Sequence, residues 1–283
     1  MFTESKTTDE YEIVFASFRG GDFSSSIHAI SPDGTGERQL SSAPNGLPGS
    51  LDPGVTVDGS TIVFGRGSDG THRTSVWTMD FDGSNEVRRS DWVMVRFNNG
   101  RTWPSLRPGT EQILYVAELS RRRTLILSDL DGSGRDELGL GEFPSFSPDG
   151  SRLAFMRDKV VTVLNLDSRE EREVGLRGDD YPSWSPDGTQ LLISRSAGEN
   201  ADLFLVNLAD GSEERITNTP DVSEKNAVLS PDGEMIAFRA LSPNAPQGWE
   251  NSIFVMDASP GSEAKEITDS RHNDTRPSWH LKR

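Results

Sequence analysis

The heptapeptides PSFSPDG at residues 144–150 and PSWSPDG at residues 182–188 decide the fold of this 283-residue chain. Each ends in Pro-Asp-Gly, which combines a fixed φ, a side chain that bonds its own backbone and a residue free to take positive φ. A tight turn between two antiparallel strands requires these properties. Each heptapeptide therefore predicts a strand, a tight turn and a second strand.

The same pattern returns along the chain, with first positions 38 to 51 residues apart. Weaker copies are PGVTVDG at 53–59, PSLRPGT at 104–110, AVLSPDG at 227–233 and the half-copy PSWH at 277–280. A short apolar run, such as LAF at 153–155, follows each full copy and has the length and composition of a strand. Self-similarity at such a spacing is typical of repeat architectures.

A second hairpin follows in each unit, for example VWTMDFDG at 76–83 and LILSDLDG at 125–132. A polar run that ends in an apolar residue, such as ERIT at 214–217, closes the unit. Each unit therefore contains four antiparallel strands. Units of this kind stack radially as the blades of a β-propeller.

The two ends of the chain are expected to complete one blade. The copy at 277–280 has no strands after it, whereas the apolar runs at 13–15, 27–30 and 38–40 have no inner strand before them. The predicted fold is all-β: a six-bladed β-propeller of four-stranded antiparallel blades, closed by a C-terminal inner strand that joins three N-terminal strands. We expect one domain over residues 1–283, with a disordered tail at 1–10.

These repeats resemble the WD40-like (PD40) repeats of the TolB family of β-propellers. The segments PSWSPDG at 182–188, IAF at 236–238 and IFVMDA at 253–258 carry the resemblance, which extends from about residue 11 to residue 280. It implies a bacterial protein whose propeller serves as a docking platform.

Acidic residues outnumber basic ones by 45 to 29, so the formal net charge is −16. Nucleic-acid affinity comes mainly from counterions that basic residues displace, and the chain contains no Lys/Arg-rich block of that kind. No apolar run approaches the ~20 residues needed to span a bilayer. We therefore expect no nucleic-acid partner and no membrane insertion.

The opening residues 1–14 have neither the basic nor the apolar region of an export signal. As written, the chain is expected to be cytoplasmic, and periplasmic if a signal peptide was removed. The absence of cysteine is compatible with both compartments, and it excludes disulfides and thiol nucleophiles.

The turns of the repeat differ between the two faces of the expected propeller. The Pro-Asp-Gly and Asp-x-Asp-Gly turns share one face and are short. The opposite face, here called the loop face, carries irregular insertions, and binding residues usually lie on variable loops of a rigid scaffold. These insertions are residues 18–26, 67–75, 88–103, 196–202, 240–252 and 269–276.

Arginines align at the ends of the second strands. Arg66, Arg157 and Arg195 occupy the same position of three repeats, and Arg239 lies one place earlier in its own. Guanidinium groups suit carboxylate and phosphate, so these residues predict an anion-binding site on the loop face. The alternative is local pairing with the abundant Asp and Glu side chains of adjoining blades.

One residue before each inner strand should line the mouth of the central channel. Such a mixture of aromatic, amide and charged groups suits a small molecule or a peptide end, and the long loop at 240–252 adds an aromatic anchor, Trp249. The six mouth residues are Asp52, Trp103, Phe143, Tyr181, Asn226 and Arg276. Of these, Trp103, Tyr181, Asn226 and Arg276 are predicted ligand-binding residues.

Two functions remain open. A binding module that docks a protein, a peptide or a small anionic ligand fits the lack of any nucleophile elbow, phosphate loop or zinc motif. The alternative is a small-molecule enzyme, a lyase, isomerase or hydrolase, with its site at the channel mouth. The Asp-x-Asp-Gly turns lack the ligand set of a calcium loop, so we expect neither metal nor cofactor.

Overall fold

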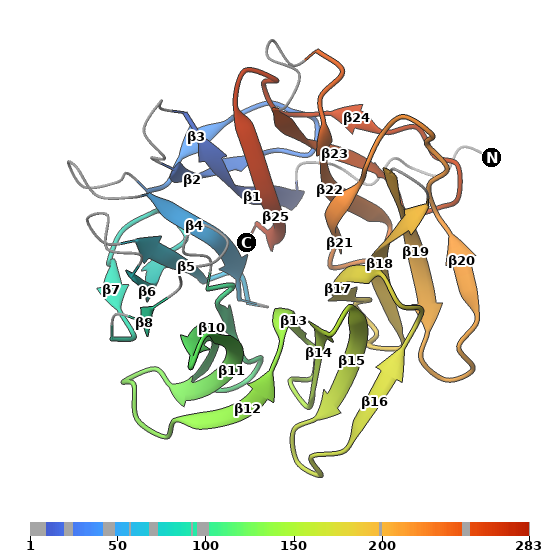
Figure 1. Cartoon of the computed structure of the whole chain (residues 1–283). Coiled ribbons are helices and arrows are strands. Elements are labelled where there is room, and N and C mark those ends of the chain that lie inside the picture. Colours follow the sequence, from blue (N-terminus) through green and yellow to red (C-terminus); the bar gives the residue numbers. More distant parts are fainter. Residues whose placement is uncertain are drawn as a thin grey trace.

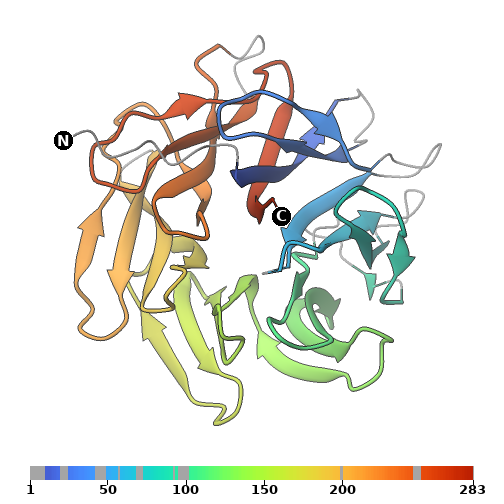
Figure 2. The same ribbon diagram turned by 180° about the vertical axis from the view of Figure 1, so that it is seen from behind.

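The computed structural model describes residues 10–19, 25–41, 49–56, 58–67, 73–91, 93–94, 102–197, 200–244 and 250–282. Six antiparallel sheets form a ring around a central axis (Figure 1), and Figure 2 shows the same ring from behind. The six-bladed β-propeller predicted from the sequence is confirmed. Within the described residues, no helix is long and apolar enough to cross a membrane.

Each blade runs from an inner strand at the axis to an outer strand at the rim. Blade 1 consists of β25 (Asn273–Leu281), β1 (Tyr11–Phe18), β2 (Ser25–Ile30) and β3 (Arg38–Gln39). Blade 2 consists of β4 (Ser50–Val55), β5 (Thr61–Gly67), β6 (Arg73–Asp80) and β7 (Val87–Arg88), with β8 (Val93–Met94) paired to β6. Blade 3 consists of β9 (Ser105–Leu106), β10 (Gln112–Leu119), β11 (Arg122–Asp129) and β12 (Asp136–Leu140).

The other three blades repeat this order. Blade 4 consists of β13 (Glu142–Phe146), β14 (Arg152–Arg157), β15 (Val160–Asn165) and β16 (Glu171–Val174). Blade 5 consists of β17 (Asp179–Trp184), β18 (Gln190–Ala197), β19 (Asn200–Asn207) and β20 (Glu213–Arg215). Blade 6 consists of β21 (Lys225–Leu229), β22 (Met235–Leu241), β23 (Asn251–Asp257) and β24 (Lys265–Glu266).

The Pro-Asp-Gly turns have the chemistry expected of them. In blade 4, the Gly150 amide donates to the Ser147 carbonyl at 2.8 Å, and Gly150 has a φ of 69°. Asp149 accepts bonds from the Ser147 hydroxyl at 2.5 Å and the Ser151 amide at 3.0 Å. These hydrogen bonds, with that of the Ser147 hydroxyl the largest, lower the pKa of Asp149 to about 2. The bonds that close this turn therefore lie within it, and Arg107 of blade 3 adds a bond from its Nε to the Gly150 carbonyl at 2.8 Å.

Apolar side chains fill the spaces between neighbouring blades. The described core residues divide into six clusters, and each cluster joins two adjacent blades. Successive residues of a second strand face opposite neighbours: Ile62 and Phe64 of β5 pack toward blade 1, whereas Val63 packs toward blade 3. Both faces of each blade are thus buried, which a single blade cannot achieve alone.

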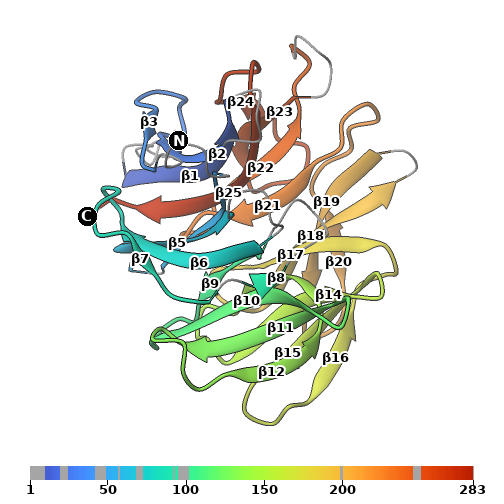
Figure 3. The same ribbon diagram turned by 60° about the vertical axis from the view of Figure 1, so that its left-hand side comes forward.

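The chain ends close the ring in blade 1. Strand β25 pairs antiparallel with β1 from Tyr11–Leu281 to Phe18–Asn273, and Figure 3 shows the two strands side by side. The seam with blade 6 is apolar, and its cluster includes Tyr11 and Trp279. The Trp279 indole nitrogen also donates to the Val228 carbonyl at 3.0 Å. The predicted closure by the C-terminal inner strand is confirmed.

We predict that Trp279→Ala lowers the free energy of unfolding by about 3–5 kcal/mol, the cost of truncating a buried aromatic side chain. Trp184→Ala is the matched control, because Trp184 occupies the same repeat position and donates to the Ser145 carbonyl at 2.9 Å. Chemical denaturation of both variants measures the two losses. A large loss for Trp184→Ala with none for Trp279→Ala would show that the seam is open in solution.

Candidate functional site

The inner strands share a local irregularity at the channel mouth. One residue per blade has a positive φ, between 42° and 61°, although none is glycine. The ladder between the first two strands shifts register at this point in five blades, and proline follows the residue in all blades but the sixth. Because proline donates no ladder bond, it suits a bulge. The six residues are Asp52, Trp103, Phe143, Tyr181, Asn226 and Arg276.

These six residues line a cavity of about 150 Å³ on the channel axis, here called the channel cavity. The next two residues of each inner strand complete its wall, as Pro144 and Ser145 do in blade 4. The six positions that the sequence predicts at the mouth therefore meet at one place. Their side chains come from six blades and differ in chemistry.

Arg276 occupies the centre of this group. Its guanidinium lies over the rings of Trp103, Phe143 and Tyr181, at 5.5, 5.4 and 5.7 Å from their centroids. Its Nε lies 3.3 Å from the Asp52 carboxylate. Aromatic faces attract cations within about 6 Å, so the three rings and Asp52 hold the guanidinium at the axis.

A second cavity of about 160 Å³ shares residues with the channel cavity and is here called the vestibule. Arg239 donates from Nε to the Asn226 side-chain oxygen at 2.6 Å and from Nη1 to that of Asn251 at 3.2 Å. The lining contains two arginines and three neutral polar side chains, and none of its residues is acidic. It consists of Phe143, Tyr181, Asn226, Arg239, Asn273, Thr275 and Arg276.

The other predicted arginines pair within their own blades. Arg66, only 3% exposed, makes two 2.8 Å bonds to Glu86. Arg157 pairs with Glu171, and Arg195 pairs with both Asp179 and Glu213. Arg66, Arg157 and Arg195 are not among the residues that line either cavity. The structure thus gathers Arg239 and Arg276 at the mouth and keeps the other three on the blade faces.

Parts of the predicted loop face differ from expectation. Trp249 lies outside the described residues. The expected insertion at 196–202 is mostly strand, because β18 ends at Ala197 and β19 begins at Asn200. The sequence prediction did not include Asn273 and Thr275, which line the vestibule with Arg276. Regular alternation along β25 places both on the face opposite to Arg276, and the register shift in this strand is not visible in the sequence pattern.

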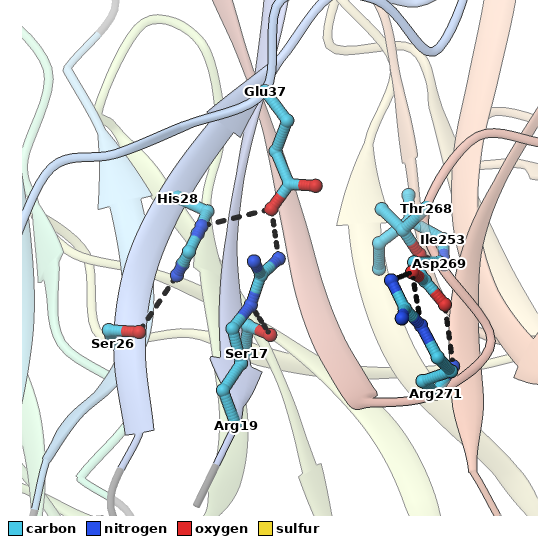
Figure 4. Close-up of polar contacts among 9 residues, drawn as sticks. All are labelled: Ser17, Arg19, Ser26, His28, Glu37, Ile253, Thr268, Asp269 and Arg271. Atoms are coloured by element: carbon cyan, nitrogen blue, oxygen red, sulfur yellow. Dashed lines mark hydrogen bonds and ion pairs between the residues drawn. The ribbon is translucent and has the colours of Figure 1, made fainter.

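Two separate groups of polar side chains, one from blade 1 and one from blade 6, lie where these blades adjoin (Figure 4). The buried His28 ring lies between Ser26, with its Nε2 2.8 Å from the hydroxyl, and Glu37, with its Nδ1 3.0 Å from the carboxylate. This is the order of a nucleophile, a base and an acid, but Glu37 also pairs with Arg19, and His28 is only 3% exposed. We interpret the group as the polar part of the closing seam.

Asp274, on β25 of the same seam, is fully buried. Burial raises its pKa from 3.8 to about 6, and the nearby side chains of Ser17 and Thr268 offset only part of this rise. Asp179 has the same place in blade 5 and pairs with Arg195, whereas the cross-strand neighbour of Asp274 is Ser17. Burial also lowers the pKa of His28 from 6.5 to about 4, so both groups favour their neutral forms.

Comparison with protein families matches the repeat. Residues 140–249, which span blades 4 and 5 and part of blade 6, match the family described as TolB β-propeller domain. Residues 140–249 thus carry TolB-type propeller repeats. A search of curated proteins found no match to this sequence.

Solved structures share the TolB-type fold at low sequence identity. TolB from Acinetobacter baumannii is 17% identical, with a TM-score of 0.77 over 96% of this chain and 67% of that one. A putative TolB from Agrobacterium tumefaciens is 14% identical, with a TM-score of 0.66 over 97% of this chain and 99% of that one. An oligogalacturonate lyase in complex with manganese is 16% identical, with a TM-score of 0.57 over 87% of this chain and 74% of that one. These likenesses establish the fold alone.

No group of three or more His, Asp or Glu side chains that could hold a metal ion occurs in the part of the chain that the structure describes.

We predict that Asp274→Asn stabilises the fold at pH 7. The folded protein keeps the Asp274 proton up to a pKa of about 6, whereas the unfolded chain releases it near 3.8. Between these values the folded state binds more protons, so the contribution of Asp274 to stability falls as pH rises. The gain in Asp274→Asn should be about 2 kcal/mol larger at pH 7 than at pH 4. Denaturation at several pH values measures the gain.

His28→Gln is the control, because its effect on stability should depend on pH in the opposite direction. His28 protonates near pH 6.5 when unfolded and near 4 when folded, so its contribution to stability falls as pH drops through that window. The stability deficit of His28→Gln should therefore shrink toward pH 4. Parallel pH profiles for both variants and the parent would contradict burial of these groups.

Proposed function

We propose that this protein is a non-catalytic binding module that holds an anionic group of a peptide or small ligand in the vestibule. The observation that carries the proposal is the vestibule lining, where Arg239 and Arg276 meet three neutral polar side chains and no acid. Guanidinium groups and amide donors suit a carboxylate. The TolB-type repeat supports a docking role, since the resemblance implies a docking platform.

The charge of the whole chain strengthens this argument. A net charge of −16 repels anions over most of the surface, so capture of an anion needs a local cationic site. On the blade faces Arg157 and Arg195 pair with carboxylates. In the vestibule Arg239 donates to the side-chain amides of Asn226 and Asn251. The lining there combines two arginines with neutral polar side chains, which suits a carboxylate entering from the loop face.

An array of N-acetylated hexapeptides, synthesised with free C-termini and in parallel as C-terminal amides, tests the proposal. Binding should require the free carboxylate. Arg239→Gln should weaken binding to the best hexapeptide by roughly 10- to 150-fold, since a charged hydrogen bond is worth about 1.5–3 kcal/mol.

Arg135→Gln is the matched control, because Arg135 pairs with Glu137 at the exposed rim of blade 3. It changes the net charge equally and should leave affinity unchanged. Equal binding of free and amidated peptides, or unchanged affinity of Arg239→Gln, would contradict the proposal.

The second candidate is a small-molecule enzyme at the same mouth. The fold of the oligogalacturonate lyases favours it, and so does Asp180. Burial raises the pKa of Asp180, which lies within the field of Arg276, as a general acid requires.

We predict that Asp180→Asn leaves peptide affinity unchanged. The enzymatic alternative is tested by incubating the parent protein with oligogalacturonate and Mn²⁺. Ultraviolet absorbance then measures any unsaturated product. Turnover that Asp180→Asn abolishes would replace the binding proposal with the enzymatic one.

A further inference from the structure

Three consecutive arginines occur once in the sequence, at residues 121–123. With Arg157 they line a cavity of about 370 Å³ between blades 3 and 4, here called the arginine cleft. Arg121 and Arg122 are exposed, whereas Arg123 is half-buried and pairs with Glu142. The full lining is Arg121, Arg122, Arg123, Leu140, Gly141, Glu142, Met156, Arg157 and Asp158.

The arginine cleft carries an excess of positive charge. Four arginines and two acidic residues, Glu142 and Asp158, line it. Because Arg123 pairs with Glu142 and Arg157 pairs with Glu171, the excess comes from the exposed Arg121 and Arg122. The chain as a whole has a net charge of −16. Clefts lined by one sign of charge concentrate ligands of the opposite sign. Leu140 and Met156 add apolar surface for the aliphatic part of a side chain.

The turn that presents the cleft is strained. Ser120 and Arg121 join β10 to β11 with φ values of 50° and 63°, and positive φ at both central residues favours Asn-Gly. An arginine in this conformation is strained, and strain of this kind clusters at ligand sites. Asp158 and Lys159 form the same turn in blade 4, with φ values of 51° and 66°.

The cleft continues into the channel mouth. Glu142 lines the cleft, and the next residue, Phe143, lines both the channel cavity and the vestibule. Arg123 also lies over the Trp103 ring, 5.7 Å from its centroid. An extended chain advances about 3.3 Å per residue, so a short segment can reach from one site to the other.

We propose that the arginine cleft binds the acidic side chains of a peptide segment whose C-terminal carboxylate occupies the vestibule. This inference rests on the proposed function and names the partner chemistry: an acidic C-terminal peptide. The peptide is favoured over a carboxylated sugar because Leu140 and Met156 contact the methylene groups of Asp and Glu side chains, which uronates lack.

The hexapeptide array provides the test. Peptides that bind the parent protein should be enriched in Asp and Glu upstream of the free C-terminus. The double variant Arg121→Gly and Arg122→Gln should lose this enrichment and bind the best acidic hexapeptide about tenfold more weakly at low salt, since exposed ion pairs are worth about 0.2–1 kcal/mol each. Glycine relieves the positive φ of Arg121, so the variant should be no less stable than the parent.

The matched control is Lys159→Gly with Arg135→Gln, which removes two charges and relieves the same turn in the neighbouring blade. It should keep the acidic preference. An equal loss of affinity in both double variants, or no preference for acidic peptides, would overturn the proposal that the cleft binds acidic side chains. The requirement for a free C-terminal carboxylate would still stand. Loss of that requirement would overturn both proposals. If the protein binds oligogalacturonate through Arg121 and Arg122 and does not bind acidic peptides, the cleft takes a carboxylated sugar. That result would overturn the proposal of a peptide ligand.

Discussion

Each blade has, within its inner strand or just before it, a non-glycine residue in the left-handed backbone conformation, and the shape of the channel mouth depends on this constraint. Such residues cost of order 1–3 kcal/mol each and persist only where the surroundings fix them. Here the antiparallel ladders on both sides of the bulge and the apolar clusters between blades fix the backbone. Six side chains are thereby directed to one axis, whatever their chemistry.

The fixed backbone separates two uses of arginine. On the blade faces, Arg66 and Arg195 bind carboxylates of their own blades and stabilise the sheets. At the axis, Arg276 lies among three aromatic rings beside Asp52, and Arg239 lies among amides. The same residue type thus pairs with carboxylates on the blade faces and packs among aromatic rings and amides at the axis.

The fold follows from local chemistry, which explains why the sequence predicts it so fully. The bonds that close a Pro-Asp-Gly turn lie within it, and the unpaired strands at the two ends leave one way to complete the ring. The mouth positions follow from the repeat for the same reason. The partners of the arginines do not follow from the repeat. Glu86 and Glu171 contact Arg66 and Arg157 from a different part of the same blade, and no local sequence pattern predicts these contacts. The acid-free vestibule likewise depends on Asn273 and Thr275, which only ring closure brings beside Arg239.

The central claim is that a carboxylate binds between Arg239 and Arg276. Nuclear magnetic resonance of the arginine Nε–Hε groups tests it most directly, with the best hexapeptide added in free and in amidated form. The account predicts shifts of the Arg239 and Arg276 signals with the free peptide only, while the Arg66 and Arg195 signals stay fixed. Unmoved Arg239 and Arg276 signals, or equal shifts with the amidated peptide, would contradict it.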